Sequence, residues 1–174
     1  MSLTKLVLEL IDLRSFSNLW YWIALAVTWS TASHWILGVP YDMVLRARRH
    51  GDAAMADLQD MVRIHVNRIL FIVHEAGLLL LALVCCGLTM LGLLGFWYQV
   101  EFCQAVFLLF APLTIIAALS VRTAHKIKDH GDMGEDLCRM LSRHRIVVQV
   151  IGMISIVVTA MWGMLQNFNI SPLG

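Results

Sequence analysis

The chain has 174 residues, of which 59% are hydrophobic and only 14% are charged, and its mean hydropathy is +0.74. This composition excludes a disordered chain and favours a membrane protein, because soluble domains carry about 25% charged residues. The formal net charge of +1 provides no bulk attraction to nucleic acid, so we expect no nucleic-acid partner.

The chain begins with an amphipathic stretch over residues 1–16. Leu3, Leu6, Leu10 and Leu13 recur at helical spacing. This pattern predicts a helix that lies along the membrane interface, or an ordered helical lead-in to the first membrane span.

Four long stretches that lack Asp, Glu, Lys and Arg follow. They comprise 27 residues between Arg14 and Asp42, 25 between Glu75 and Glu101, 20 from Phe102 to Val121 and 29 from Ile146 to Gly174. A helix of about 20 apolar residues crosses a hydrocarbon core and satisfies its own backbone hydrogen bonds. We therefore predict an all-α integral membrane protein with one membrane domain, 1–174, and four transmembrane helices in an up-down bundle. The predicted spans are 17–39, 70–97, 103–121 and 146–167.

The basic residues fall almost entirely between these spans. The segments 40–69 and 122–145 hold 11 of the 13 Lys and Arg residues. Because short positively charged loops stay in the cytoplasm, both segments are predicted to be cytoplasmic. Both termini are then periplasmic if the membrane is a bacterial inner (plasma) membrane. Aromatic clusters such as 20–22 and 96–98 fall at the opposite, outer ends of the spans, where such residues anchor at headgroup level.

The two predicted cytoplasmic segments share a sequence pattern. His50-Gly51-Asp52 precedes Asp57-Leu58, Met61 and His65, and His130-Gly131-Asp132 precedes Asp136-Leu137, Met140 and His144. Two explanations stay open: chance similarity, or duplication of a two-helix hairpin.

Each segment also carries one apolar stripe at helical spacing. The two stripes are Leu58, Met61, Val62, His65 and Ile69, and Leu137, Met140, Leu141, His144 and Val148. Each stripe predicts a helix with one face packed on a core. We therefore expect helices two and four to begin in the cytoplasm and to continue unbroken into the bilayer, which would form a cytoplasmic stalk.

Four histidines are candidate cofactor ligands. His34 and His74 lie within apolar stretches at similar predicted depth, and ionisable groups inside a membrane tend to face the bundle interior. Glu75 is a polar intramembrane candidate for the same reason. Two neutral histidines on facing helices can bind heme b, and His65 with His144 forms a second pair if the duplication is real. Hydrogen-bonded structural histidines are the alternative, so no cofactor is predicted and heme b is kept as the competing hypothesis.

No catalytic or metal site is predicted. Cys85, Cys86, Cys103 and Cys138 show no CxxC spacing. Five arginines near the inner boundary are predicted to contact anionic lipid or a partner, or else only to set the topology. They are Arg46, Arg48, Arg49, Arg122 and Arg145.

A family resemblance is carried by residues within the first 70 positions. The matching runs are Asp12 to Trp22, Ser33-His34-Trp35 and Gly38 to Arg49. They resemble a small alphaproteobacterial four-helix membrane-protein family whose members are labelled as a component of the SufBCD complex, which assembles iron–sulfur clusters. The resemblance implies a bacterial inner membrane and a link to cluster assembly, and it supplies no catalytic residues.

Three functions compete at this point. The first is a non-enzymatic multi-pass protein that acts as a scaffold, anchor or accessory subunit, with its cytoplasmic stalk docked to a protein partner or to another copy. The second is a heme- or quinone-binding redox subunit that uses the inner-leaflet histidines. The third is a small transporter, for which helices one and four offer only hydroxyl side chains such as Ser30, Ser155 and Thr159.

Overall fold

The computed structural model describes residue 16 and residues 18–131 and 134–170. Within these residues the chain is helical apart from one short hairpin and the turns between helices, so the predicted all-α class is confirmed. The elements are α2 (Leu19–His34), β1 (Trp35–Ile36), β2 (Val39–Pro40), α3 (Tyr41–His50), α4 (Asp52–Gly92), the π-helical turn η2 (Leu93–Trp97), α5 (Glu101–His130) and α6 (Glu135–Ile170). The N-terminal helix predicted over 1–16 lies outside the described residues, Phe16 excepted.

The first long helix is shorter than the sequence predicts. α2 ends at His34, and β1 and β2 pair as an antiparallel hairpin. Leu37 and Gly38 in its turn both have positive φ, at 51° and 82°, which is the backbone pattern of a tight type I′ hairpin turn. Pro40, the last residue of β2, is the N-cap residue of α3, which begins at Tyr41. The prediction of helix over 17–39 is therefore wrong beyond His34.

Three helices, not two, continue from the apolar stretches into the charged segments. α4 and α6 do so as predicted, but α5 also extends past Val121 to His130. No glycine or proline interrupts it there, and it ends where Gly131 adopts a left-handed φ of 57°. The Gly131 N–H donates to the Ile127 carbonyl at 3.2 Å, which closes the last turn. The predicted third helix, 103–121, is therefore too short, because the chain stays helical through 122–130.

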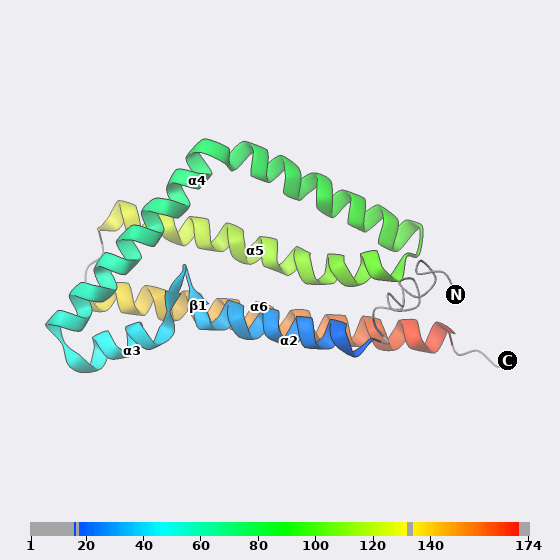
Figure 1. Cartoon of the computed structure of the whole chain (residues 1–174), viewed down its shortest axis with the longest axis horizontal. Helices are drawn as coiled ribbons and strands as arrows, with labels where there is room; N and C mark the ends of the chain where they lie inside the picture. The colour runs from blue at the N-terminus through cyan, green and yellow to red at the C-terminus, as the bar shows by residue number, and fades with distance from the viewer. Residues whose placement is uncertain (1–15, 17, 132–133, 171–174) are drawn as a thin grey trace, which may run out of the picture.

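The long helices lie side by side (Figure 1). Among the long helices, α4 packs against α5, α5 against α6 and α6 against α2, and the shorter α3 packs against α4. α4 is bent near its middle, so its first half runs obliquely to the other helices and its second half follows α5. α2 approaches α6 closely at Gly152, where an added Cβ would lie 2.8 Å from the ring of Trp29. Small residues allow such close helix packing.

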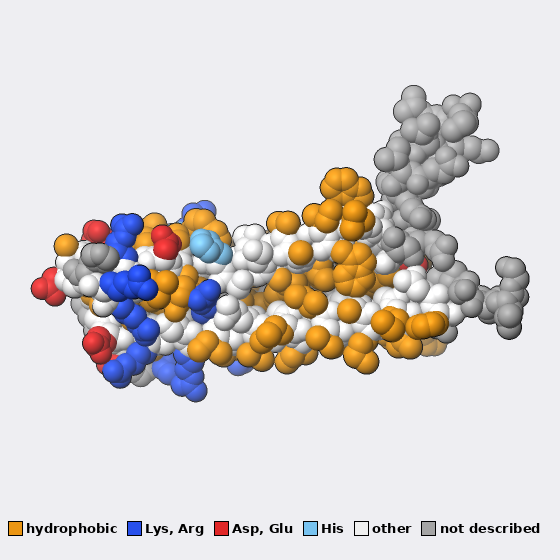
Figure 2. Space-filling model, turned by 90° about the horizontal axis from the view of Figure 1, so that it is seen from below, with side chains coloured by type: hydrophobic (Ala, Val, Ile, Leu, Met, Phe, Trp, Pro, Cys, Tyr) orange, Lys and Arg blue, Asp and Glu red, His pale blue; other side chains and the backbone are white. Residues whose placement is uncertain are grey.

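The main packed core lies among the charged segments rather than in the apolar stretches. We call this part of the molecule the charged end and define it as residues 35–70, 122–130 and 135–145. Leu58, Val44 and Leu141 there are completely buried (0% exposed), whereas Leu78 in the apolar half of α4 is 87% exposed. Figure 2 shows the charged side chains gathered at one end and hydrophobic side chains along the rest of the visible face.

Three helices are long and apolar enough to cross a membrane: Asp52–Trp97, Glu101–Asp129 and Glu135–Phe168. The most apolar 18-residue window of the first has no buried residue, and such a continuous apolar surface is covered by lipid or by protein in a stable molecule. The chain is thus consistent with an integral membrane protein. With 16 residues, α2 is about 24 Å long, short of a ~30 Å hydrocarbon core. A fourth span and the orientation stay predictions.

The sequence pattern shared by the two charged segments has a structural counterpart. Gly51 and Gly131 both have positive φ and both separate two helices. Buried residues before the two glycines occupy matching positions, namely Val44 and Ala124, and Ala47 and Ile127. After the glycines, the buried pairs Leu58 and Leu137, and Val62 and Leu141, match with an offset of one residue. Both predicted apolar stripes therefore face the core, while gene duplication stays a prediction.

Candidate functional site

The hairpin of β1 and β2 is packed into the charged end. Ile36, Leu37 and Val39 are 2%, 6% and 0% exposed and belong to the same hydrophobic cluster as Val62 and Leu58 of α4. The burial of these three apolar side chains anchors the hairpin between α2 and α3 to the first half of α4.

His65, a candidate cofactor ligand, packs against this hairpin. A Cβ added to Gly38 would lie only 2.5 Å from Nδ1 of the His65 ring. The ring therefore fills the space that a side chain at position 38 would need. In this structure the His65 ring packs against the hairpin turn and holds it on α4.

His144, the second member of the predicted symmetric pair, is hydrogen-bonded on both ring nitrogens. It is 6% exposed. Its Nε2 lies 3.3 Å from the Ser120 hydroxyl and its Nδ1 lies 3.2 Å from the Thr123 hydroxyl, both on α5. Since Thr123 donates its own proton to the Leu119 carbonyl, it accepts from a protonated Nδ1, and Nε2 accepts from Ser120. Heme ligation by His144 would require one of these contacts to break.

His34 and His74 line separate cavities. His34 is exposed and lines a cavity with Arg145, whereas His74 lines another with His125 and Lys128. The His74 side chain is 87% exposed, and its Nδ1 lies 3.5 Å from a carboxylate oxygen of Glu75. Across the described residues, no group of three or more His, Cys, Asp or Glu side chains is placed to hold a metal ion.

The five arginines singled out from the sequence divide into two kinds. Arg46, Arg48, Arg49 and Arg122 are exposed. Arg145 is half-buried: its guanidinium carbon lies 3.8 Å from the centroid of the Tyr41 ring, and its Nε donates to the Ser33 carbonyl at 3.3 Å. A hydrogen bond with Ser142, together with one from Arg145 and its positive charge, lowers the pKa of the Tyr41 hydroxyl below its ordinary value.

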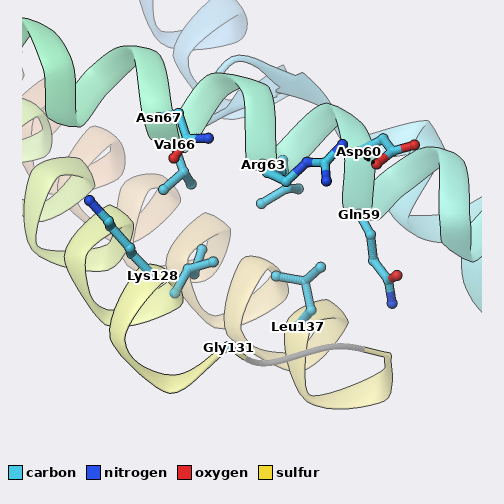
Figure 3. Close-up of a pocket in the computed structure, with 10 residues that line it drawn as sticks. Gln59, Asp60, Arg63, Val66, Asn67, Lys128, Gly131 and Leu137 are labelled. Atoms are coloured by element: carbon cyan, nitrogen blue, oxygen red, sulfur yellow. Dashed lines mark ion pairs between the residues drawn. The ribbon is translucent and has the colours of Figure 1, made fainter.

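A cavity of about 310 Å³ opens on the charged end between α4, the end of α5 and the start of α6 (Figure 3). Its apolar lining residues are buried, and they are Val62, Val66, Ile127 and Leu137. Around them lie polar and charged side chains, namely Gln59, Asp60, Arg63, Asn67 and Lys128. Asp60 and Arg63 form an ion pair of 2.9 Å. Apolar pockets surrounded by polar groups are typical of protein-binding surfaces.

A buried polar network at the opposite end of the molecule was missed by sequence reasoning. Gln104 is 1% exposed, and its amide nitrogen donates to the Gly95 carbonyl at 2.8 Å. Its amide oxygen accepts from the Trp162 indole at 3.0 Å and from Gln166 at 2.7 Å. The network joins η2, α5 and α6. Its signal in the sequence is two glutamines inside charge-free stretches, which a count of charged residues does not register.

Comparison of the chain with models of known protein families, with curated proteins and with solved structures found no significant match.

Proposed function

We propose that this chain is a non-enzymatic integral membrane protein whose charged end docks a partner protein, so that it acts as a scaffold, anchor or accessory subunit. The observation that supports this most is the separate hydrophobic core of the charged end, with an open apolar cavity in its surface. Helices that only crossed a bilayer would need no packed core beyond their apolar stretches.

The cavity suggests the chemistry of the partner. Burial of one leucine-sized side chain among Val62, Val66 and Leu137 would contribute about 1.5–3 kcal/mol. Asp60 already pairs with Arg63, whereas no carboxylate of the described residues forms an ion pair with Lys128. The partner segment is therefore expected to carry an apolar side chain next to an acidic one.

The membrane arrangement is part of the proposal. By the positive-inside rule the charged end faces the cytoplasm of a bacterium, with α2 as a fourth span and both termini in the periplasm. The family resemblance directs the search for partners to the SufBCD iron–sulfur assembly complex. The experiment that identifies the partner has to detect any cytoplasmic protein and also a second copy of this chain.

Site-specific photo-crosslinking in living cells tests the docking surface. A photoreactive amino acid replaces Gln59, which lines the cavity, and in a matched control it replaces Asp57. Asp57 is exposed and lies two residues earlier on α4, about 200° around the helix axis. We expect a protein adduct from position 59 that is absent from position 57 and is weakened by Lys128→Glu.

Two results separate the alternatives. An adduct that contains only this chain, at twice its 19.6 kDa, would identify a second copy as the partner. Equal adducts from positions 57 and 59, or none from either, would contradict docking at this cavity.

A further inference from the structure

Two adjoining cavities form one groove between α2 and α6. One has a volume of about 390 Å³ and is lined by Ser30, Thr31, Ser33, His34, Trp35 and Arg145. The other, of about 540 Å³, shares Ser30 and Ser33 and continues along Trp29, Val148, Met153 and Ile156. The groove is therefore polar and basic at one end and mainly apolar at the other.

Arg145 provides the charge at the polar end. Its Nε is used by the Ser33 carbonyl, and the Tyr41 ring supports one face of the guanidinium. Another N–H of the guanidinium is hydrogen-bonded to the Tyr41 hydroxyl. The remaining N–H groups are donors, and no carboxylate of the described residues forms an ion pair with them. A guanidinium fixed in this way is well suited to a phosphate group.

The position of Arg145 along the chain points to a lipid phosphate. It is the last charged residue before the charge-free stretch 146–174, so it lies where α6 passes from the charged end to the apolar part. Trp35, which is 51% exposed beside it, is of the residue type that gathers at the headgroup level of membranes. A phosphate bound here would belong to the layer of lipid headgroups.

The apolar part of the groove offers one unsatisfied donor. Trp29 is 6% exposed and its indole Nε1 is buried without a hydrogen-bond partner among the described residues. An unpaired buried N–H costs about 1–3 kcal/mol, which an acceptor would recover only after a shift of the ring that exposes it. Glycerophospholipids carry a phosphate next to acyl chains, which matches the polar and apolar ends of this groove.

We infer that the groove between α2 and α6 binds one anionic phospholipid, with its phosphate at Arg145 and one acyl chain along Trp29, Met153 and Ile156. This site is independent of the cavity proposed for the partner protein, because the two share no lining residue. The continuous apolar extension favours a lipid over free phosphate, and the unpaired charge favours an anionic lipid over a zwitterionic one.

Native mass spectrometry of the full chain in mild detergent tests this inference. The probes are phosphatidylglycerol, phosphatidylethanolamine and soluble glycerol 3-phosphate. We expect one phosphatidylglycerol bound per chain in preference to phosphatidylethanolamine, and no stable adduct with glycerol 3-phosphate. Loss of a charge-assisted hydrogen-bonding group lowers affinity by about tenfold or more. Arg145→Gln is therefore expected to weaken the binding of phosphatidylglycerol by that factor.

Matched variants make the test specific. Arg143→Gln removes an exposed arginine two residues away and should leave binding unchanged. Arg145→Lys keeps the charge but not the stacked guanidinium, so its affinity should lie between those of the parent protein and Arg145→Gln. Ser30→Trp, at a position shared by both cavities, should block the lipid while Arg145 stays in place. Equal loss in Arg143→Gln and Arg145→Gln, no preference between the two lipids, or tight binding of glycerol 3-phosphate would overturn the inference.

Discussion

Replacement of Gly38 by alanine tests how the hairpin is held in the charged end. The new Cβ would lie 2.5 Å from Nδ1 of His65, whereas ordinary contacts begin at 3.4 Å, so the ring has to move by about 0.9 Å. Overpacking of this kind costs about 1–3 kcal/mol. The positive φ of 82° adds about 1–2 kcal/mol for a residue that has a Cβ. We expect Gly38→Ala to lower the free energy of unfolding by about 2–5 kcal/mol.

Gly131→Ala is the matched control for backbone strain. Gly131 also has a positive φ, at 57°, but a Cβ there meets no atom within 4 Å. Its cost should therefore be limited to about 1–2 kcal/mol. Both variants are compared with the parent protein by reversible unfolding in detergent, followed by tryptophan fluorescence.

A double-mutant cycle isolates the contact with His65. His65→Ala removes the ring, so the steric part of the Gly38→Ala penalty should disappear in the double variant, with a coupling energy of about 1–3 kcal/mol. If the two substitutions prove additive, or if Gly38→Ala costs no more than Gly131→Ala, His65 does not seat the hairpin. The packing role assigned to this histidine would then be wrong.

Three further outcomes follow from burial, hydrogen bonding and charge. Leu141→Ala, at a fully buried position, should lower the free energy of unfolding in detergent by about 2–5 kcal/mol. Leu78→Ala, at an 87% exposed position, should change it by no more than about 0.5 kcal/mol. Equal costs would show that the core is elsewhere. Gln104→Leu leaves the Trp162 indole without its acceptor and should lower the free energy of unfolding by about 1–3 kcal/mol, measured in the same way. Amide hydrogen exchange in η2 should become faster, and unchanged exchange would refute the structural role of the network. The pKa of Tyr41 is lower in the folded chain than in the unfolded one, so the free energy of unfolding should rise as pH increases through the folded-state pKa. Tyr41→Phe should abolish that rise. A rise that persists in the variant must come from another group.

The features predicted correctly from the sequence are those that depend on local periodicity. The stripe of Leu58, Val62 and Ile69 follows the 3.6-residue repeat of a helix, and a count of charges along the chain locates the apolar stretches. Both signals are contained within a few turns of chain. They are enough to place α4 and α6, and the core that they share.

The features that were missed depend on local backbone geometry or on residues far apart in the chain. The hairpin was hidden because its apolar residues continue the charge-free run, although Gly38 and Pro40 were signals against a helix. The extension of α5 was missed because charged residues were equated with a loop. The separation of His34 from His74, and the contacts of Arg145 with Tyr41 and Ser33, depend on the rotation and bend of whole helices. No pattern along the chain encodes these.

The central claim is that α4 has two environments, a packed half in water and an unpacked half in lipid. Site-directed spin labels placed one at a time along 53–96, in a chain whose four cysteines are first replaced, measure this directly in liposomes. Accessibility to a water-soluble nickel complex should be periodic over 53–70, with minima at Leu58, Val62 and Val66. Over 78–90, oxygen should reach labels on all sides of the helix, and the nickel complex should reach none of them. Nickel access on any face of 78–90, or uniform access over 53–70, would contradict the account.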